Sequence, residues 1–424
     1  MIRGKPDSFI YHHLDIDKMH RQALNLWEGV LGDPWSGALR KYDKKEKAEN
    51  ERAILQLIKK MEESKSKEKT RNILEGFLLE GPLFSPEGKE IFRDPGFFRS
   101  SEDFITKVRN YDPEIAKEEI GQAFRNVWIM NLLQKSFEIP VECTEGVFGY
   151  SMLYPYTDNF MDDPGIEKKE KYLACDRVHR RLLGNREQAE KTEEAKIYDM
   201  IEKIEATFSR ELHPGVFESL LYIHHSQRES LRQQSSPLGE NIWKNELRTE
   251  PQETELQEKP LLEISFHKGG ASVLADGYLV KGTLNEEERI FCFNYGVLLQ
   301  MADDLQDCKE DYENRHRTLF SLDYGKKTLD NGADRLIGFA EKVFDMYFAN
   351  KEGMRMNYFL MENTLLLILG SVLMNPAAFS EAYVHRAEIH FPVSQKFLEI
   401  QQEGLKEKLK NQEQRGVKDS LEIW

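Results

Sequence analysis

The sequence of 424 residues is poor in cysteine and has no long apolar run. Its four cysteines, Cys143, Cys175, Cys292 and Cys308, include no CxxC pair, so reduced thiols in a cytosolic protein are the default expectation. The N-terminus lacks the apolar core of a signal peptide. The longest apolar run, 364–374, is shorter than the about 20 residues of a membrane span. We therefore expect a cytoplasmic protein without a transmembrane segment, and a buried helix at this run.

Positive charge is also in deficit. Lysine and arginine number 59 against 74 aspartates and glutamates, which gives a net charge of −15. An acidic chain is a poor partner for nucleic acid or an anionic membrane surface. Hydrophobic residues make up 40% and aromatic residues 11%, enough for a sizeable core and too much for global disorder.

Alternating strand patterns are missing, whereas apolar residues recur at helical spacing throughout. The fold class we predict is therefore all-α. Helices are expected over 14–42 with a break at Gly32-Asp33-Pro34, and then over 45–80, 101–111 and 114–137, with a loop at 81–96. The polar stretch 233–260 is predicted to be a long loop within one domain, and 401–424 a polar helix or tail.

Asp303, Asp304, Asp307 and Asp311 follow the apolar segment VLLQMA within Phe291–Arg317. On a helix Asp303 and Asp307 share a face, Asp304 lies beside Asp303, and Asp311 continues the row one turn later. Carboxylates this close repel unless a cation lies among them. Mg²⁺ suits such oxygen ligands together with a substrate phosphate. The alternative is a solvated acidic helix face.

A second acidic cluster has the same design. The apolar, aromatic stretch that begins at Gly146 leads into Asp158, Asp162 and Asp163, and Pro164-Gly165 is expected to end the helix directly after them. The helix dipole disfavours negative charge at a C-terminal end, so this placement needs an external cation. Pro155 is expected to kink the helix. If the two acidic helices pack together, their carboxylates form two walls at the mouth of an apolar cavity, where metal ions would hold a diphosphate.

The segments DNFMDD (158–163) and QMADDLQDCKED (300–311) resemble the two aspartate-rich motifs of class I isoprenoid synthases. The first departs from the common DDxxD and is closer to the squalene-synthase style. The resemblance covers residues about 110–400. It implies one large helical bundle with a central apolar cavity and an N-terminal helical extension. The domain ranges we predict are 1–110 for the extension, 111–400 for the core and 401–424 for the tail.

The resemblance also implies a site with three Mg²⁺ ions, Mn²⁺ being an alternative. Asp158, Asp162 and Asp163 would bind metal from one wall, and Asp303, Asp304 and Asp307 from the other. Asp158, Asp162, Asp303 and Asp307 are the predicted catalytic residues. An apolar, aromatic cavity would exclude water from a carbocation and stabilise it. Each of the candidate lining residues also fits an ordinary core position: Phe124, Trp128, Tyr150, Tyr154, Tyr222 and Tyr295.

A diphosphate also needs direct cationic partners. Arg228 and Arg232 share one helical side, although a solvated basic stripe fits them equally. Gly269-Gly270 would break or kink a helix and allow close backbone approach. This resembles the broken helix of the superfamily, with Lys268 available to phosphate. Arg315, Arg317 and Lys326 follow the acidic residues of 303–311 and resemble the basic residues that close over a diphosphate.

Several features of individual branches are missing. The sequence has no GGKRxRP segment of chain-elongating enzymes, no NSE triad of cyclases and no DxDD motif. The function we expect is a Mg²⁺-dependent class I terpene synthase that ionises a linear prenyl diphosphate. The alternatives are a head-to-head or chain-elongating prenyltransferase and, from a different class, a non-catalytic helical protein with surface acidic clusters. The sequence leaves the oligomeric state open, although homodimers are common among such enzymes.

Overall fold

The structure is a computed structural model. It describes residues 11–30, 34–36, 39–64, 66–163, 165–233, 258–348 and 354–404. The chain divides into two compact units, each built from two separate segments of the sequence. Unit 1 comprises Met1–Gly29 and Glu145–Leu329, and unit 2 comprises Val30–Thr144 and Asp330–Trp424. All secondary structure in the described residues is helical, which confirms the all-α prediction.

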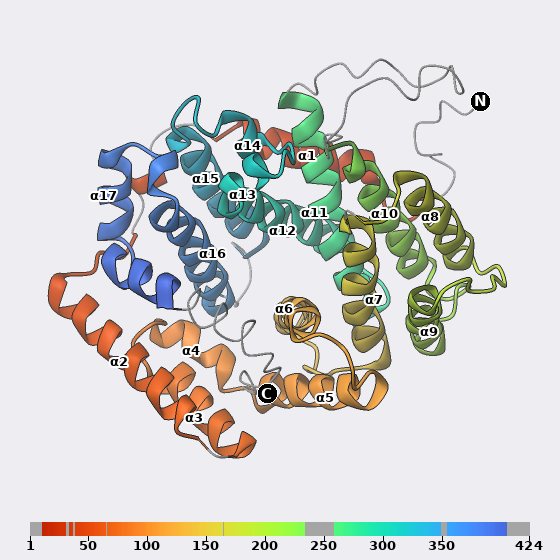
Figure 1. Cartoon of the computed structure of the whole chain (residues 1–424), viewed down its shortest axis with the longest axis horizontal. Helices are drawn as coiled ribbons and strands as arrows, with labels where there is room; N and C mark the ends of the chain where they lie inside the picture. Colours follow the sequence, from red (N-terminus) through yellow and green to blue (C-terminus); the bar gives the residue numbers. More distant parts are fainter. Residues whose placement is uncertain are drawn as a thin grey trace. The chain divides into compact units, whose positions relative to one another are not determined.

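Unit 1 is built around α11, which packs against α12, α10, α7 and α1 (Figure 1). The helices α8 and α9 pack against each other, with α8 also on α10 and α9 on α7. The elements of unit 1 are α1 (Ile16–Glu28), α7 (Glu145–Asp162), α8 (Lys168–Leu182), α9 (Thr192–Thr207), α10 (Pro214–Ser230), η2 (Leu231–Gln233), α11 (Glu258–Lys281), α12 (Glu286–Gln306), α13 (Cys308–Glu313) and α14 (Leu319–Asp323).

The backbones of α11 and α12 approach closely because glycines face each other across the contact. A Cβ atom on Gly296 would lie 2.1 Å from the carbonyl oxygen of Gly269, and one on Gly270 would lie 2.5 Å from the ring of Phe293. No side chain fits at such distances, so glycine is required there. The expected break at Gly269-Gly270 is wrong, because α11 is continuous and its glycines form a helix-packing face.

Unit 2 has an aromatic core in which Phe92 packs against Phe97, Trp128 and Phe359. One described helix, α16, contains a stretch (Met356–Met374) long and apolar enough to cross a membrane, and 56% of it is buried. This is weak evidence for a span, since buried core helices pass the same test. The elements of unit 2 are η1 (Pro34–Ser36), α2 (Lys44–Glu62), α3 (Lys67–Glu80), α4 (Pro86–Phe92), α5 (Pro95–Tyr111), α6 (Lys117–Ser136), α15 (Asp330–Phe348), α16 (Met354–Met374), η3 (Pro376–Ala378) and α17 (Glu381–Ile389).

Several predicted boundaries are wrong. The first helix ends at Glu28, the expected helix over 45–80 is two helices with a break after Glu62, and the expected loop at 81–96 contains α4. Helix α5 begins at Pro95 because Asp94 caps its N-terminus. The predicted end of α7 directly before Pro164 is confirmed, and α7 continues through Pro155. Most of the predicted loop 233–260, and nearly all of the tail 401–424, lie outside the described residues.

The two compact units have bounds that differ from the predicted domain ranges. Residues 111–144 group with 30–110 in unit 2, and Met1–Gly29 groups with the segment that carries both acidic clusters. The predicted ranges 1–110, 111–400 and 401–424 stay a prediction. For the site, the relevant result is that α7 and α12 belong to the same unit.

Candidate functional site

The acidic row lies at the C-terminal end of α12 and continues into α13. Asp303 is exposed, Asp304 is buried, and Asp307 and Asp311 are partly buried. The backbone keeps its helical hydrogen bonds across the junction, since the N–H of Asp307 donates to the carbonyl of Asp303 and that of Asp311 to the carbonyl of Asp307. The spacing of four residues therefore places these three side chains along one side of the backbone.

Asp304 is fixed by two neutral donors. The hydroxyl of Ser265 on α11 donates to one carboxylate oxygen at 2.8 Å, and the amide of Gln300 donates to the other at 2.8 Å. Burial raises the pKa of Asp304 to about 6, although both hydrogen bonds and the charge of Lys268 oppose the shift. Gln300 precedes Asp304 by one helical turn, so its role could be anticipated, whereas no sequence signal pointed to Ser265.

Asp311 is more strongly perturbed. Burial first, and then the charges of Asp304, Asp307 and Asp303, raise the pKa of Asp311 to about 8, while Lys268 acts in the opposite direction. A carboxyl group near neutral pKa marks a place where negative charge is crowded. Lys268 on α11 is the cation that the electrostatics of both Asp304 and Asp311 have in common. The four carboxyl groups and this lysine define the acidic row used below.

The acidic end of α7 lies at the same end of α11. Gly146 faces the carbonyl of Leu279, and the hydroxyl of Tyr150 donates to the carbonyl of Ser272 at 3.4 Å, so α7 runs antiparallel to α11. Helix α12 is antiparallel to α11 as well, because Ser265 meets Asp304 near one end and Lys281 meets Glu288 at the other. The C-terminal ends of α7 and α12 therefore point the same way along α11.

In the acidic cluster of α7, the side chains of Asp158 and Asp162 lie outside the described part of the structure. Asp163 is exposed and accepts a hydrogen bond from the N–H of Gly165 at 2.7 Å. The end of α7 already has a cation: buried Lys171 on α8 donates to the carbonyl of Met161 at 2.5 Å. The positive charge of Lys171 thus offsets the negative end of the helix dipole from within the protein. The sequence analysis did not anticipate this contact.

Two of the predicted diphosphate-binding cations are engaged by acids. Arg228 pairs with Asp176 at 2.7 Å and lies over the ring of Tyr172, and Arg232 pairs with Glu229 at 3.2 Å. Both pairs are partly exposed. The basic-stripe alternative named for these residues is therefore compatible with the structure.

The remaining predicted cations differ in placement. Lys268 lies near the acidic row, whereas Arg315 and Lys326 are exposed. The backbone N–H of Arg317 donates to the carbonyl of Gln233 at 3.0 Å, which brings the turn that contains Arg232 next to the segment after α13. The basic residues on these two turns are thus neighbours, although 85 positions of sequence separate Arg232 from Arg317.

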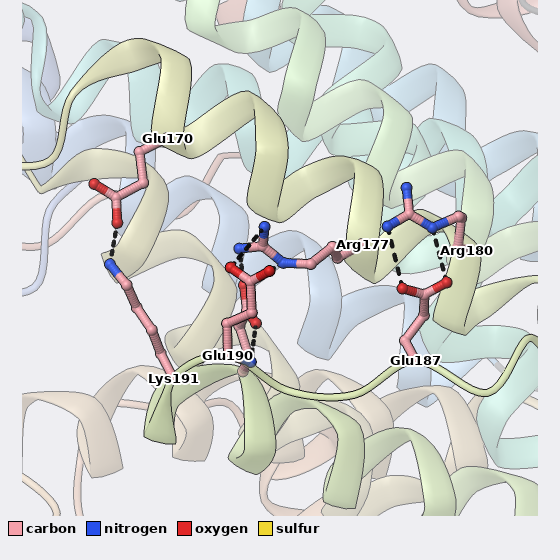
Figure 2. Close-up of polar contacts among 7 residues, drawn as sticks. Glu170, Arg177, Arg180, Glu187, Glu190 and Lys191 are labelled. Atoms are coloured by element: carbon pink, nitrogen blue, oxygen red, sulfur yellow. Dashed lines mark hydrogen bonds and ion pairs between the residues drawn. The ribbon is translucent and has the colours of Figure 1, made fainter.

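In a different charged region of unit 1, on α8, α9 and the connection between them, each basic side chain pairs with an acidic one (Figure 2). Arg177 contacts buried Glu194 at 2.9 Å and Glu190 at 3.2 Å. Arg180 makes two hydrogen bonds to Glu187, at 2.8 and 3.1 Å, and Lys191 pairs with Glu170. We call these residues the ion-pair ladder. Charge alone therefore does not distinguish a site in this chain.

The predicted aromatic lining falls in two groups. Phe124 and Trp128 belong to unit 2, where Trp128 contacts Phe97 at 5.1 Å between ring centroids. Tyr150, Tyr154, Tyr222 and Tyr295 belong to unit 1, and all but Tyr154 are buried.

Neither hollow identified in the described residues is lined by these six aromatic residues. The first, of about 20 Å³, lies in unit 1 beside Phe160, Met161 and His224 and has room for about one water molecule. The second is an open groove of about 470 Å³ in unit 2, beside Arg99 and Val141. The central apolar cavity stays a prediction.

The donor chemistry of the acidic row suits a hard cation, yet no three His, Cys, Asp or Glu side chains in the described residues are arranged to enclose a metal ion. All four cysteines are buried and form no disulfide. Compared with known proteins, the chain matches no family model, no curated protein and no solved structure. Any functional assignment therefore depends on the motifs and on the geometry described above.

Proposed function

We propose that unit 1 is a Mg²⁺-dependent class I terpene synthase that ionises a linear prenyl diphosphate and releases diphosphate. The observation that carries the proposal is the acidic row, where the pKa of Asp311 is raised to about 8 by burial and by three neighbouring carboxylates. A further support is that α7 and α12 end at the same end of α11. Negative charge is concentrated where the motif resemblance expects cations to bind.

Within this proposal each described residue has a distinct task. Asp303, Asp307 and Asp311 would hold the cation, and Asp158 and Asp162 would join them from α7. Asp304, which Ser265 and Gln300 already hold, would fix the orientation of the row. Lys268 would bind a diphosphate oxygen directly. The bound Mg²⁺ would neutralise negative charge on the departing diphosphate. The buried tyrosines of α7 and α12 would keep water away from the carbocation formed on the hydrocarbon.

Two alternatives remain in the proposal. A head-to-head or chain-elongating prenyltransferase would use the same acidic row to join two prenyl diphosphate molecules, which are identical in the head-to-head case, so its product would carry the carbon atoms of both. A non-catalytic helical protein is favoured by the absence of a preformed metal enclosure in the described residues and by the ion pairs of Arg228 and Arg232. In that case the acids would be solvated surface or a weak divalent-cation buffer.

The test is diphosphate release from a panel of prenyl diphosphates of increasing length, singly and in pairs, with Mg²⁺ and with excess chelator. We expect Mg²⁺-dependent release that falls about 100-fold or more in Asp303→Asn/Asp307→Asn, because losing the cation removes several kcal/mol of charge stabilisation. Glu287→Gln, which removes one exposed acid from the opposite end of α12, is the matched control and should retain activity.

Mass spectrometry of the products would separate the two enzymatic functions, since the product of a cyclase keeps the carbon number of one substrate molecule, whereas that of a prenyltransferase carries the carbon atoms of two. Absence of release by the wild type with every substrate would refute the catalytic proposal. Release that is equal in the double variant would refute the assignment of the acidic row.

A further inference from the structure

A cluster of histidines and tyrosines lies where α1 packs against α11 in unit 1. The imidazole of His20 on α1 stacks on that of His267 on α11, with ring centroids 4.2 Å apart and planes 8° from parallel. Trp27 packs edge-on against Phe266 of α11 at 5.9 Å. The N-terminal helix is thus anchored by aromatic contacts that include two titratable rings.

The hydrogen bonds of this cluster suit neutral imidazoles. The hydroxyl of Tyr222 on α10 lies 2.5 Å from Nδ1 of His267, and Tyr11 packs edge-on against Tyr222 at 5.5 Å. Nε2 of His20 is buried without a hydrogen-bond partner. A proton on His20 would therefore have no acceptor at that atom and would place a positive charge against the second ring.

The surrounding charges do not compensate such a proton. Burial first, and then the charges of His20 and His225, lower the pKa of His267 to about 3. Burial also lowers the pKa of His20, although Glu263 on α11 and Asp17 on α1 oppose that shift.

The other charged groups near the stacked histidines are paired with other residues. Glu218 of α10 binds His13, and Glu286 of α12 pairs with Lys18. Burial lowers the pKa of His225, and Arg228 of α10 adds to that shift, but Arg228 pairs with Asp176. No acid in this set is placed to offset a proton on either stacked ring.

Apart from the contacts of His13 with Glu218 and of Lys18 with Glu286, the N-terminal end of α1 has little support. Asp15, its N-cap residue, has a left-handed backbone (φ 52°) and its side chain makes no capping hydrogen bond, so the helix lacks the stabilisation that a cap provides. Docking of α1 therefore depends on its packing face, which carries the buried residues Met19, Ala23 and Trp27 and, beside them, His20.

We propose that the stacked pair His20–His267 is an acid-sensitive latch, which holds α1 on α11 when both imidazoles are neutral and releases α1 when they take up protons. The direction follows from linkage. A histidine whose pKa is lower in the docked state than in the released state, where it is about 6.5, favours release increasingly as the pH falls below 6.5. The latch is independent of the proposed enzymatic activity.

The test is hydrogen exchange of the full-length protein between pH 7.5 and 4.5, corrected for the intrinsic exchange rate at each pH. Because release lets two histidines with lowered pKa values bind protons, the protection of α1 amides should fall by more than tenfold per pH unit below 6.5, with about 100-fold per unit as the limit. In His20→Phe, which keeps an aromatic ring on His267 but removes one proton site, the fall should be about tenfold per unit. The amides of α12 should keep their protection in both proteins.

Two further variants complete the design. His385→Phe removes an exposed histidine of unit 2 and should leave the wild-type slope unchanged. Tyr222→Phe removes the hydroxyl on Nδ1 of His267 and should move the onset of release to higher pH. The latch is overturned if α1 of the wild type keeps its protection to pH 4.5, if α1 and α12 lose protection together, or if His20→Phe has the wild-type slope. The wild-type profile alone suffices if a variant does not fold.

Discussion

The acidic row and the ion-pair ladder are both dense in charge and both lie in unit 1, yet they differ in how that charge is balanced. In the ladder each arginine meets a carboxylate at hydrogen-bonding distance, as in Arg177–Glu194 and Arg180–Glu187. In the row, burial first, and then the charges of three neighbouring carboxylates, raise the pKa of Asp311 to about 8 against the opposing charge of Lys268. Charge that the fold leaves unbalanced, rather than charge as such, indicates a binding site.

The largest effect is expected from breaking the buried part of the ladder. Arg177→Met leaves the carboxylate of Glu194, which is only 4% exposed, without its main partner. We expect a loss of about 3 kcal/mol in the free energy of unfolding, measured by urea denaturation followed by circular dichroism. The double variant Arg177→Met/Glu194→Gln should recover most of the loss, and an unchanged stability of the single variant would contradict the buried pairing.

The next effect concerns the helix contact that positions the row. Gly296→Ala puts a methyl group 2.1 Å from the carbonyl oxygen of Gly269, so α12 must move away from α11 at a cost of about 2 to 3 kcal/mol. Gly121→Ala is the matched control, because a Cβ atom there meets nothing within 4 Å on an exposed face of α6, and it should stabilise by about 0.5 to 1 kcal/mol. Equal effects of the two substitutions would disprove the close approach.

The contribution of Asp311 to folding stability should decrease as the pH rises, which is opposite to that of a carboxylate whose pKa is lowered by folding. Asp311 has its folded pKa raised to about 8, so its contribution to stability is present below its unfolded pKa of about 4 and is lost as the pH rises to about 8. We expect Asp311→Asn to be more stable than the wild type by about 2 kcal/mol at pH 8, a value discounted for solvent screening. The gain should vanish at pH 4, and a gain that persists there would point to another cause.

The smallest effect is expected for the exposed ion pair of the ladder, Arg180–Glu187. Arg180 is 46% exposed, and surface ion pairs contribute little even with two hydrogen bonds. Arg180→Ala should leave the free energy of unfolding nearly unchanged in the same denaturation assay. A loss as large as that of Arg177→Met would mean that exposure does not separate the two rungs.

Much of the helical content could be predicted from the sequence because local signals decide it. Pro164-Gly165 correctly placed the end of α7, and the turn spacing of Asp303, Asp307 and Asp311 placed them on one side of the chain. Gly269-Gly270 misled because a glycine pair weakens an isolated helix and equally permits two helices to approach. Only the presence of Gly296 on the partner helix decides between these outcomes, and periodicity carries no information about partners.

The candidate site was less predictable for the same reason. Ser265 and Asp304 lie 39 positions apart, and Lys171 reaches the carbonyl of Met161 from the following helix. Arg228 was identified as a cation, but its partner Asp176 lies on another helix. Side chains that meet through tertiary packing leave no local trace, so the sequence identified the acids and not the groups that hold or neutralise them.

The split composition of unit 1 has a consequence for synthesis on the ribosome. Helix α1 emerges before its docking partners α11 and α12, which follow only after the whole segment Val30–Thr144 and the helices α7 to α10 have been made. At about 5–20 residues per second, the nascent α1 waits on the order of ten seconds or longer, with the side chains of Met19 and Trp27 uncovered. Until then this amphipathic segment is a natural client for a chaperone near the exit tunnel.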